Sequence, residues 1–103
     1  MIKVSVFYPN KEGARFNMDY YLQKHIPMVR QKMAGAMKGI GVEQGIAGGM
    51  PGAPLTYRVI AHMTFDSVEA YQTAFSAHAP SILADVPNYT DLQPVIQISE
   101  VKM

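Results

Sequence analysis

The sequence predicts one α+β domain in which a four-stranded antiparallel sheet carries two helices on one face. Three observations support this fold. The elements follow the order strand, helix, strand, loop, strand, helix, strand; each helix has a single apolar stripe; and both helices carry a His-x-Pro tripeptide, at 25–27 and 78–80. Two such halves make the ferredoxin-like βαββαβ arrangement. A chain of 103 residues fits a single domain spanning 1–103.

Four segments have the pattern of β-strands. The clearest is 55–65, in which apolar residues alternate with polar ones, and 2–8 alternates in the same way. The segment 36–47 contains three glycines, so we expect it to be bulged or to lie at a sheet edge. The segment 94–101 is predicted to form the last strand.

The first helix is predicted to begin at Asn17, whose side chain can cap it, with Asp19 in the first turn. Pro27 should kink or restart this helix because proline has no amide hydrogen to donate. Gly35 is expected to end it. The stripe expected to face the core consists of Met18, Tyr21, Leu22, His25 and Val29.

The second helix is predicted to begin after Ser67 and to be interrupted at Pro80, as the first is at Pro27. Its expected core stripe consists of Val68, Tyr71, Phe75, His78 and Ile82.

Composition and charge exclude several classes of function. Nine basic and eight acidic residues give a net charge of +1, which argues against a nucleic-acid partner. The absence of cysteine excludes disulfides and thiolate catalysis. The sequence starts without a secretory leader and has no apolar run of about 18 residues, so we expect a cytoplasmic protein with no membrane partner. The three histidines lack the spacing of metal ligands, so no metal site is expected.

His25 and His78 are the most informative candidates for chemistry, because each lies on an apolar stripe just before a proline. A buried imidazole costs free energy unless it is hydrogen-bonded. One interpretation is a core histidine whose partner is a carbonyl freed at the proline. The other is that both point into a cavity between helices and sheet, with His25 as a catalytic acid/base and His78 beside the ligand.

Tyr8, Tyr21, Tyr57 and Tyr71 place four hydroxyl groups on faces that should point inward. Either their rings fill the core with the hydroxyls at its rim, or the hydroxyls surround a pocket. A pocket of this kind would bind a small apolar or aromatic molecule, with Tyr8, Tyr21 and Tyr57 as ligand-binding residues.

Arg58 and His62 should lie on the opposite face of the sheet, among residues that are neither fully polar nor fully apolar. A partner sheet packed across this face would explain the mixture, and solvent exposure would explain it nearly as well.

Several motifs together resemble the EthD family over nearly the whole chain. They are Tyr8-Pro9-Asn10, the run from Gly13 to Tyr21 with His25-Ile26-Pro27, Phe65-Asp66-Ser67, the run from Asp85 to Thr90, and the run from Pro94 to Val101. Asn17 departs from the aspartate expected there, although both residues cap helices well.

The resemblance implies a homodimeric α+β barrel in which two ferredoxin-like sheets pack face to face. It also implies a link to ether degradation beside an oxygenase system, and members are often labelled EthD reductases. Related families include cofactor-free monooxygenases, isomerases, cyclases and haem-handling enzymes. One fold with so many chemistries does not select a reaction.

Three hypotheses of function follow from the residues and the resemblance together. The first is a cofactor-free acid/base enzyme, an isomerase, cyclase or monooxygenase, acting on a small apolar or aromatic intermediate. The second is a non-catalytic carrier or accessory protein to an oxygenase. The third is a haem-binding protein that uses one histidine as axial ligand.

Overall fold

The computed structural model describes residues 1–103 and contains four strands and two helical regions. In chain order the elements are β1 (Ile2–Pro9), α1 (Met18–Tyr20), the π-helical turn η1 (Tyr21–His25), α2 (Ile26–Lys32), β2 (Met37–Gln44), β3 (Tyr57–Phe65), α3 (Val68–Asp85), the 3₁₀ turn η2 (Val86–Asn88) and β4 (Val95–Glu100).

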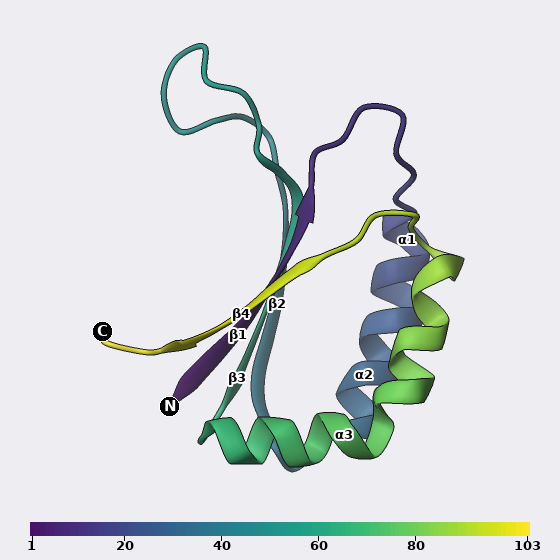
Figure 1. Ribbon diagram of the computed structural model, residues 1–103, viewed down its shortest axis with the longest axis vertical. Helices are drawn as coiled ribbons and strands as arrows, with labels where there is room; N and C mark the ends of the chain where they lie inside the picture. Colours follow the sequence, from purple (N-terminus) through teal and green to yellow (C-terminus); the bar gives the residue numbers. More distant parts are fainter.

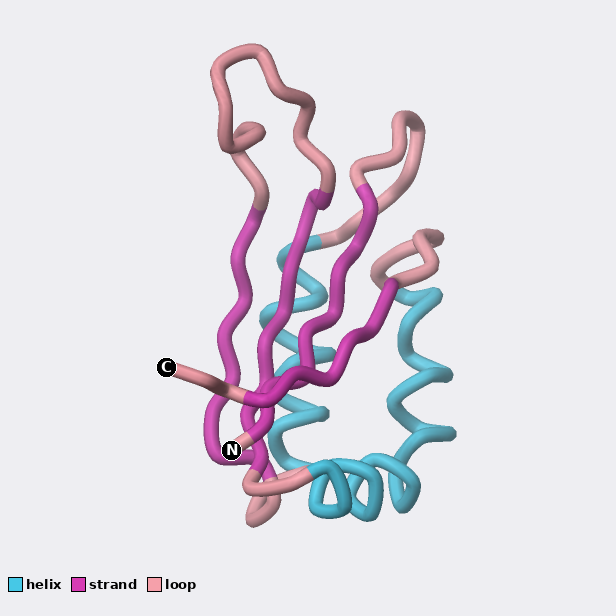
Figure 2. The backbone as a smooth tube through the Cα atoms, turned by 60° about the vertical axis from the view of Figure 1, so that its left-hand side comes forward, coloured by secondary structure: helices cyan, strands magenta, loops and turns pink.

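The four strands form one antiparallel sheet in the order β2-β3-β1-β4. All helices cover the same face of this sheet, and the other face carries no helix (Figure 1 and Figure 2). The predicted ferredoxin-like α+β fold is therefore confirmed. The edge position of β2 and the register shift between Met37 and Gly39 agree with the prediction from its glycines. No helix is both long enough and apolar enough to cross a membrane.

The first helical region begins as predicted and changes its geometry just before Pro27. Asn17 Oδ1 accepts a hydrogen bond of 3.1 Å from the backbone N–H of Tyr20. The wider π-helical turn η1 then ends at His25, and Pro27 lies in the first turn of α2, where a missing N–H costs little. Tyr21 and His25 are buried, but Leu22 is 47% exposed and does not belong to the core stripe. In this wider turn Tyr21 and His25, which are four residues apart, point inward, and Leu22 between them points outward.

The second helical region, α3, continues through Pro80 as a single element of 18 residues. Ser67 caps it, because its Oγ accepts a hydrogen bond of 3.1 Å from the N–H of Ala70. Figure 1 and Figure 2 both show that α3 bends sharply. The predicted interruption at Pro80 therefore appears as a bend within the helix, the usual effect of a proline inside a helix. The second half of α3 then runs beside α2 toward η2.

The hydrophobic core has two parts, one at each end of the helix–sheet interface. The first cluster consists of Ile2, Val4, Val29, Met33, Phe65, Tyr71 and Ile82. The second cluster consists of Tyr8, Tyr21, Val59, Ala61, Tyr89 and Leu92. Each cluster joins residues of the sheet to residues of the helical layer, so the two clusters together hold the two layers in place.

The helix-free face of the sheet carries an ordered polar network beside apolar side chains. His62 Nδ1 lies 3.0 Å from Ser5 Oγ, and His62 Nε2 lies 2.9 Å from Glu43 Oε1. This network joins β1, β3 and β2 across the face on which alternation places His62. Arg58 reaches beyond the sheet and donates hydrogen bonds to the carbonyl oxygens of Lys11 and Ala14.

Candidate functional site

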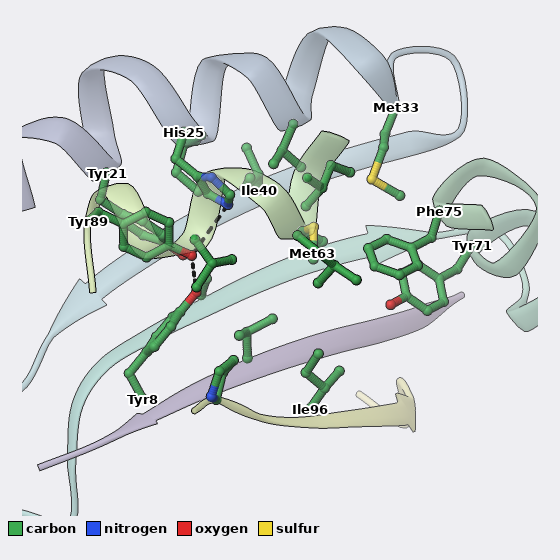
Figure 3. Close-up of a pocket in the computed structure, with 18 residues that line it drawn as sticks. Tyr8, Tyr21, His25, Met33, Ile40, Met63, Tyr71, Phe75, Tyr89 and Ile96 are labelled. Atoms are coloured by element: carbon green, nitrogen blue, oxygen red, sulfur yellow. Dashed lines mark hydrogen bonds between the residues drawn. The ribbon is translucent and has the colours of Figure 1, made fainter. Parts of the chain in front are cut away.

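A cavity of about 80 Å³ lies between the helices and the sheet, where the two core clusters meet (Figure 3). Hydrophobic residues make up 16 of the 18 that line it. The sheet contributes Ala61, Met63 and Ile96, and the helices contribute Met33 and Phe75 among others. An enclosed apolar space with few polar groups is the usual form of a small-molecule site.

The cavity has its open side at the edge strand β4. Ile96 of β4 and Leu83 of α3 line the cavity and are 50% and 56% exposed. No other strand lies beyond β4 to cover this side. A ligand larger than the enclosed volume can therefore extend between Leu83 and Ile96.

His25 is held in the cavity wall by a carboxylate from the end of α3. Its Nδ1 lies 2.9 Å from Asp85 Oδ2, and the His25 residue is only 5% exposed. Asp85 Oδ1 accepts further hydrogen bonds from Tyr20 Oη at 2.6 Å and from Asn88 Nδ2 at 2.9 Å. The carboxylate is thus fixed from both sides, which fixes the imidazole ring in turn.

The protonation states of this pair follow from its surroundings. Burial acts to raise the pKa of Asp85, but the hydrogen bonds from Tyr20, Asn88 and His25 outweigh it and hold that pKa below its usual value. Burial lowers the pKa of His25, against the opposing effect of Asp85. At neutral pH the carboxylate is therefore ionised and the imidazole is neutral. Since Nδ1 donates to Asp85, His25 Nε2 carries no proton and is a base.

Two tyrosine hydroxyls continue this network from His25 toward the sheet. Tyr89 Oη lies 3.5 Å from His25 Nε2, and Tyr8 Oη lies 2.8 Å from Tyr89 Oη. The ring of Tyr21 stacks on the His25 imidazole with a centroid distance of 5.5 Å. Burial raises the pKa of all three tyrosines, so their hydroxyls stay protonated and act as hydrogen-bond donors.

The structure brings together three of the five residues that the sequence nominated for the site. His25, Tyr8 and Tyr21 all line the cavity. Tyr57 lies away from it, because the strand pairing shifts between Tyr8 and Pro9 and the Tyr57 ring packs at 4.9 Å on Phe7.

His78 also lies outside the cavity. It is half-buried, and the nearest residues of α3 that line the cavity are Phe75 before it and Ile82 after it.

Sequence reasoning missed Asp85 and Tyr89, the two residues that contact the His25 ring nitrogens. Asp85 lies three residues beyond Ile82 and so continues the inward stripe of α3, and this spacing is a signal that could have found it. Tyr89 follows η2, and it lies beside His25 only because that turn folds back to the cavity. No pattern in the sequence indicates this position.

The residues present do not suit a haem or a metal cluster. A space of about 80 Å³ is much smaller than a porphyrin ring. No group of three or more His, Asp or Glu side chains is arranged to hold a metal ion.

Fold and site together define a ferredoxin-like α+β domain with an Asp–His pair at the wall of an enclosed apolar cavity. The model of the EthD domain matches residues 14–93 of the chain. The chain therefore belongs to the EthD family.

Solved structures agree with this membership. An EthD-like protein from Ralstonia eutropha JMP134 is 44% identical, covers 99% of this chain and 92% of its own, and superposes with a TM-score of 0.94. An EthD family protein from Bacillus halodurans C-125 is 20% identical over 98% of both chains, with a TM-score of 0.63. A dimeric ferredoxin-like protein from an uncultured marine organism is 10% identical over 100% of this chain and 96% of its own, also with a TM-score of 0.63. No curated protein matches the chain.

Proposed function

We propose that this protein binds a small apolar or aromatic molecule in the cavity and transfers a proton to or from it through His25. The observation that carries the proposal is the imidazole of His25 in the wall of an apolar cavity, held there by Asp85 through Nδ1. An oriented neutral imidazole of this kind is an effective general base, and the carboxylate stabilises the imidazolium that forms.

The reaction fits an isomerisation or cyclisation that passes through an enol or enolate. His25 Nε2 takes a proton from a carbon next to a carbonyl group, and the negative charge moves to the carbonyl oxygen. Tyr89 and Tyr8 are placed to donate hydrogen bonds that stabilise this oxygen. The proton then returns from the imidazolium to another atom of the ligand, so that His25 is restored.

A second candidate function is that of a carrier that holds an apolar compound for an oxygenase, as in ether degradation. The observation that favours it is the lining itself, in which 16 of 18 residues are hydrophobic. A carrier needs this lining, but it does not need a base with a fixed tautomer.

Deuterium exchange from solvent separates the two functions. Phenylacetone and cyclohexanone, incubated with the protein in D₂O and followed by NMR, should exchange the protons next to their carbonyl groups faster than without protein. Ala61→Leu should reduce this exchange at least tenfold, because the larger side chain fills part of the cavity. Ile60→Leu, on the helix-free face, is the matched control and should exchange as the unaltered protein does. Binding of these ketones without any exchange would favour the carrier.

We also propose that the protein is a homodimer formed through the helix-free face of the sheet. Phe7, Tyr57 and Ile60 lie only partly buried on this face, which no helix covers. A solved structure of the same fold is described as a dimeric ferredoxin-like protein, which supports homodimerisation.

Native mass spectrometry at micromolar concentration should give twice the chain mass of 11.4 kDa. Ile60→Asp should give the monomer, because a buried unpaired carboxylate opposes association. Leu22→Asp, on the exposed side of the helical layer, should remain a dimer. A monomeric unaltered protein, or an Ile60→Asp dimer of undiminished affinity, would contradict this interface.

A further inference from the structure

Tyr71 is the one cavity residue far from His25 that carries a hydroxyl group. The residue is 8% exposed, and its hydroxyl makes no hydrogen bond to any protein group, unlike the hydroxyls of Tyr8, Tyr20 and Tyr89. No fully enclosed side-chain polar atom in the protein lacks a partner, so the Tyr71 hydroxyl must be open to a space. Figure 3 shows its oxygen pointing from beside Phe75 back toward the middle of the cavity.

The two polar ends of the cavity belong to different parts of the core. Tyr71 belongs to the first cluster, and Tyr8 and Tyr89 belong to the second. Between these ends the labelled side chains of Met63 and Ile96 present only carbon and sulfur atoms (Figure 3). The cavity is thus apolar in its middle and has a hydroxyl group at each end.

The cavity also lacks fixed positive charge. Neither lysine nor arginine lines it, and His25 is neutral at neutral pH. An ionised ligand would leave water without gaining an opposite charge, which costs several kcal/mol. The lining therefore favours an uncharged ligand.

We propose that the cavity binds a neutral molecule of about one ring with oxygen at both ends, one hydrogen-bonded to the Tyr8 and Tyr89 hydroxyls beside His25 and the other accepting a hydrogen bond from the Tyr71 hydroxyl. This inference rests on the proposed function, because it names the class of ligand that the same site takes. Tyr71 is then a specificity residue, which selects the ligand by its second oxygen. Met33 and Met63 have the flexible side chains that allow such a ring to fit a space of about 80 Å³.

Two phenols of nearly equal shape test this assignment. 4-Methoxyphenol has the second oxygen, and 4-ethylphenol has a carbon in its place. Their dissociation constants are measured by NMR titration against the unaltered protein and against Tyr71→Phe. Since Tyr71 has no protein partner to lose, Tyr71→Phe should keep the thermal midpoint of the unaltered protein.

We expect Tyr71→Phe to weaken binding of 4-methoxyphenol about three- to tenfold, the usual value of one hydrogen bond, and to leave 4-ethylphenol unchanged. 4-Methoxybenzoate, which is anionic at neutral pH, should bind at least tenfold more weakly than 4-methoxyphenol.

Three results would overturn the inference. Equal weakening of both phenols would place the phenol group, not the second oxygen, at Tyr71. No weakening of either would remove Tyr71 from the site, and in both cases the proposed function would stand. If neither phenol binds the unaltered protein, the inference fails, and the deuterium exchange of the ketones decides separately whether the proposed function stands.

Discussion

Substituting alanine for His25 should slow deuterium exchange into a bound ketone by about a hundredfold or more, the usual contribution of a general base. Among the groups that line the cavity, His25 Nε2 is the only base that is unprotonated at neutral pH. The tyrosine hydroxyls cannot replace it, because burial raises their pKa values further above neutral. The rate is measured by NMR in D₂O at a ketone concentration that saturates each protein.

His25→Gln controls for loss of structure, because its amide group can still donate a hydrogen bond to Asp85. It should fold as the unaltered protein does, yet exchange as slowly as His25→Ala. Exchange at the unaltered rate in both variants would remove His25 from the mechanism.

Asp85→Asn tests the positioning role of the carboxylate in the same assay. The imidazole is retained, but an asparagine N–H facing Nδ1 forces the ring proton onto Nε2, so the ring no longer presents a base to the cavity. Exchange should fall nearly as far as in His25→Ala. The ¹⁵N shifts of the ring should show the reversed tautomer, a change that a merely structural carboxylate would not cause. An unchanged tautomer with an unchanged rate would contradict this role.

The sequence was sufficient to predict the fold because the fold depends on local patterns. Alternation along 2–8 and 55–65 defined the two central strands, and the caps at Asn17 and Ser67 defined the helix starts. Each pattern involves neighbours in the chain, so it can be seen without knowing which segments meet. The prediction for Leu22 was wrong because a helical wheel assumes α-helical geometry, and η1 is π-helical.

The site could be predicted only in part because it joins distant segments. His25 and Asp85 are 60 residues apart, and Tyr8 and Tyr89 are 81 apart. Their contact depends on how α3 bends near Pro80 and on how the chain turns back at η2. The neighbouring residues do not determine the direction of either change. A bulge at the end of β1 likewise decides that Tyr8 faces the cavity while Tyr57 packs on Phe7.

Protein stability should fall as the pH falls below about 6.5, the ordinary pKa of histidine in an unfolded chain. The pKa of His25 is lowered in the folded state, so below 6.5 the unfolded chain binds a proton that the folded chain does not. The free energy of unfolding therefore decreases by up to about 1.4 kcal/mol per pH unit until the folded His25 also titrates. Asp85, whose pKa is also lowered, adds a second decrease below about pH 4.

Urea unfolding at a series of pH values measures this decrease. His25→Gln should have a flatter profile between pH 6.5 and 5, because it has no imidazole to titrate. An equal slope in both proteins would show that His25 is not the source of the acid sensitivity.

The alkaline side should show a larger loss of stability, because four buried tyrosines contribute to it together. Burial raises the pKa values of Tyr8, Tyr21, Tyr71 and Tyr89, so above pH 10 the unfolded chain releases protons that the folded chain keeps. Each group lowers the free energy of unfolding by up to about 1.4 kcal/mol per pH unit, and four groups by about 5 kcal/mol per unit.

Because the free energy of unfolding falls this steeply with pH, the protein should unfold in the same transition in which its buried tyrosines ionise. The ultraviolet absorbance of tyrosinate should rise in one cooperative step that coincides with the loss of circular dichroism from the sheet. Tyr71→Phe should reduce the slope, since it removes one of the titrating groups without removing a protein hydrogen bond. If these tyrosines ionised gradually while the sheet stayed intact, their hydroxyls would be in contact with water, which would contradict the burial that raises their pKa values.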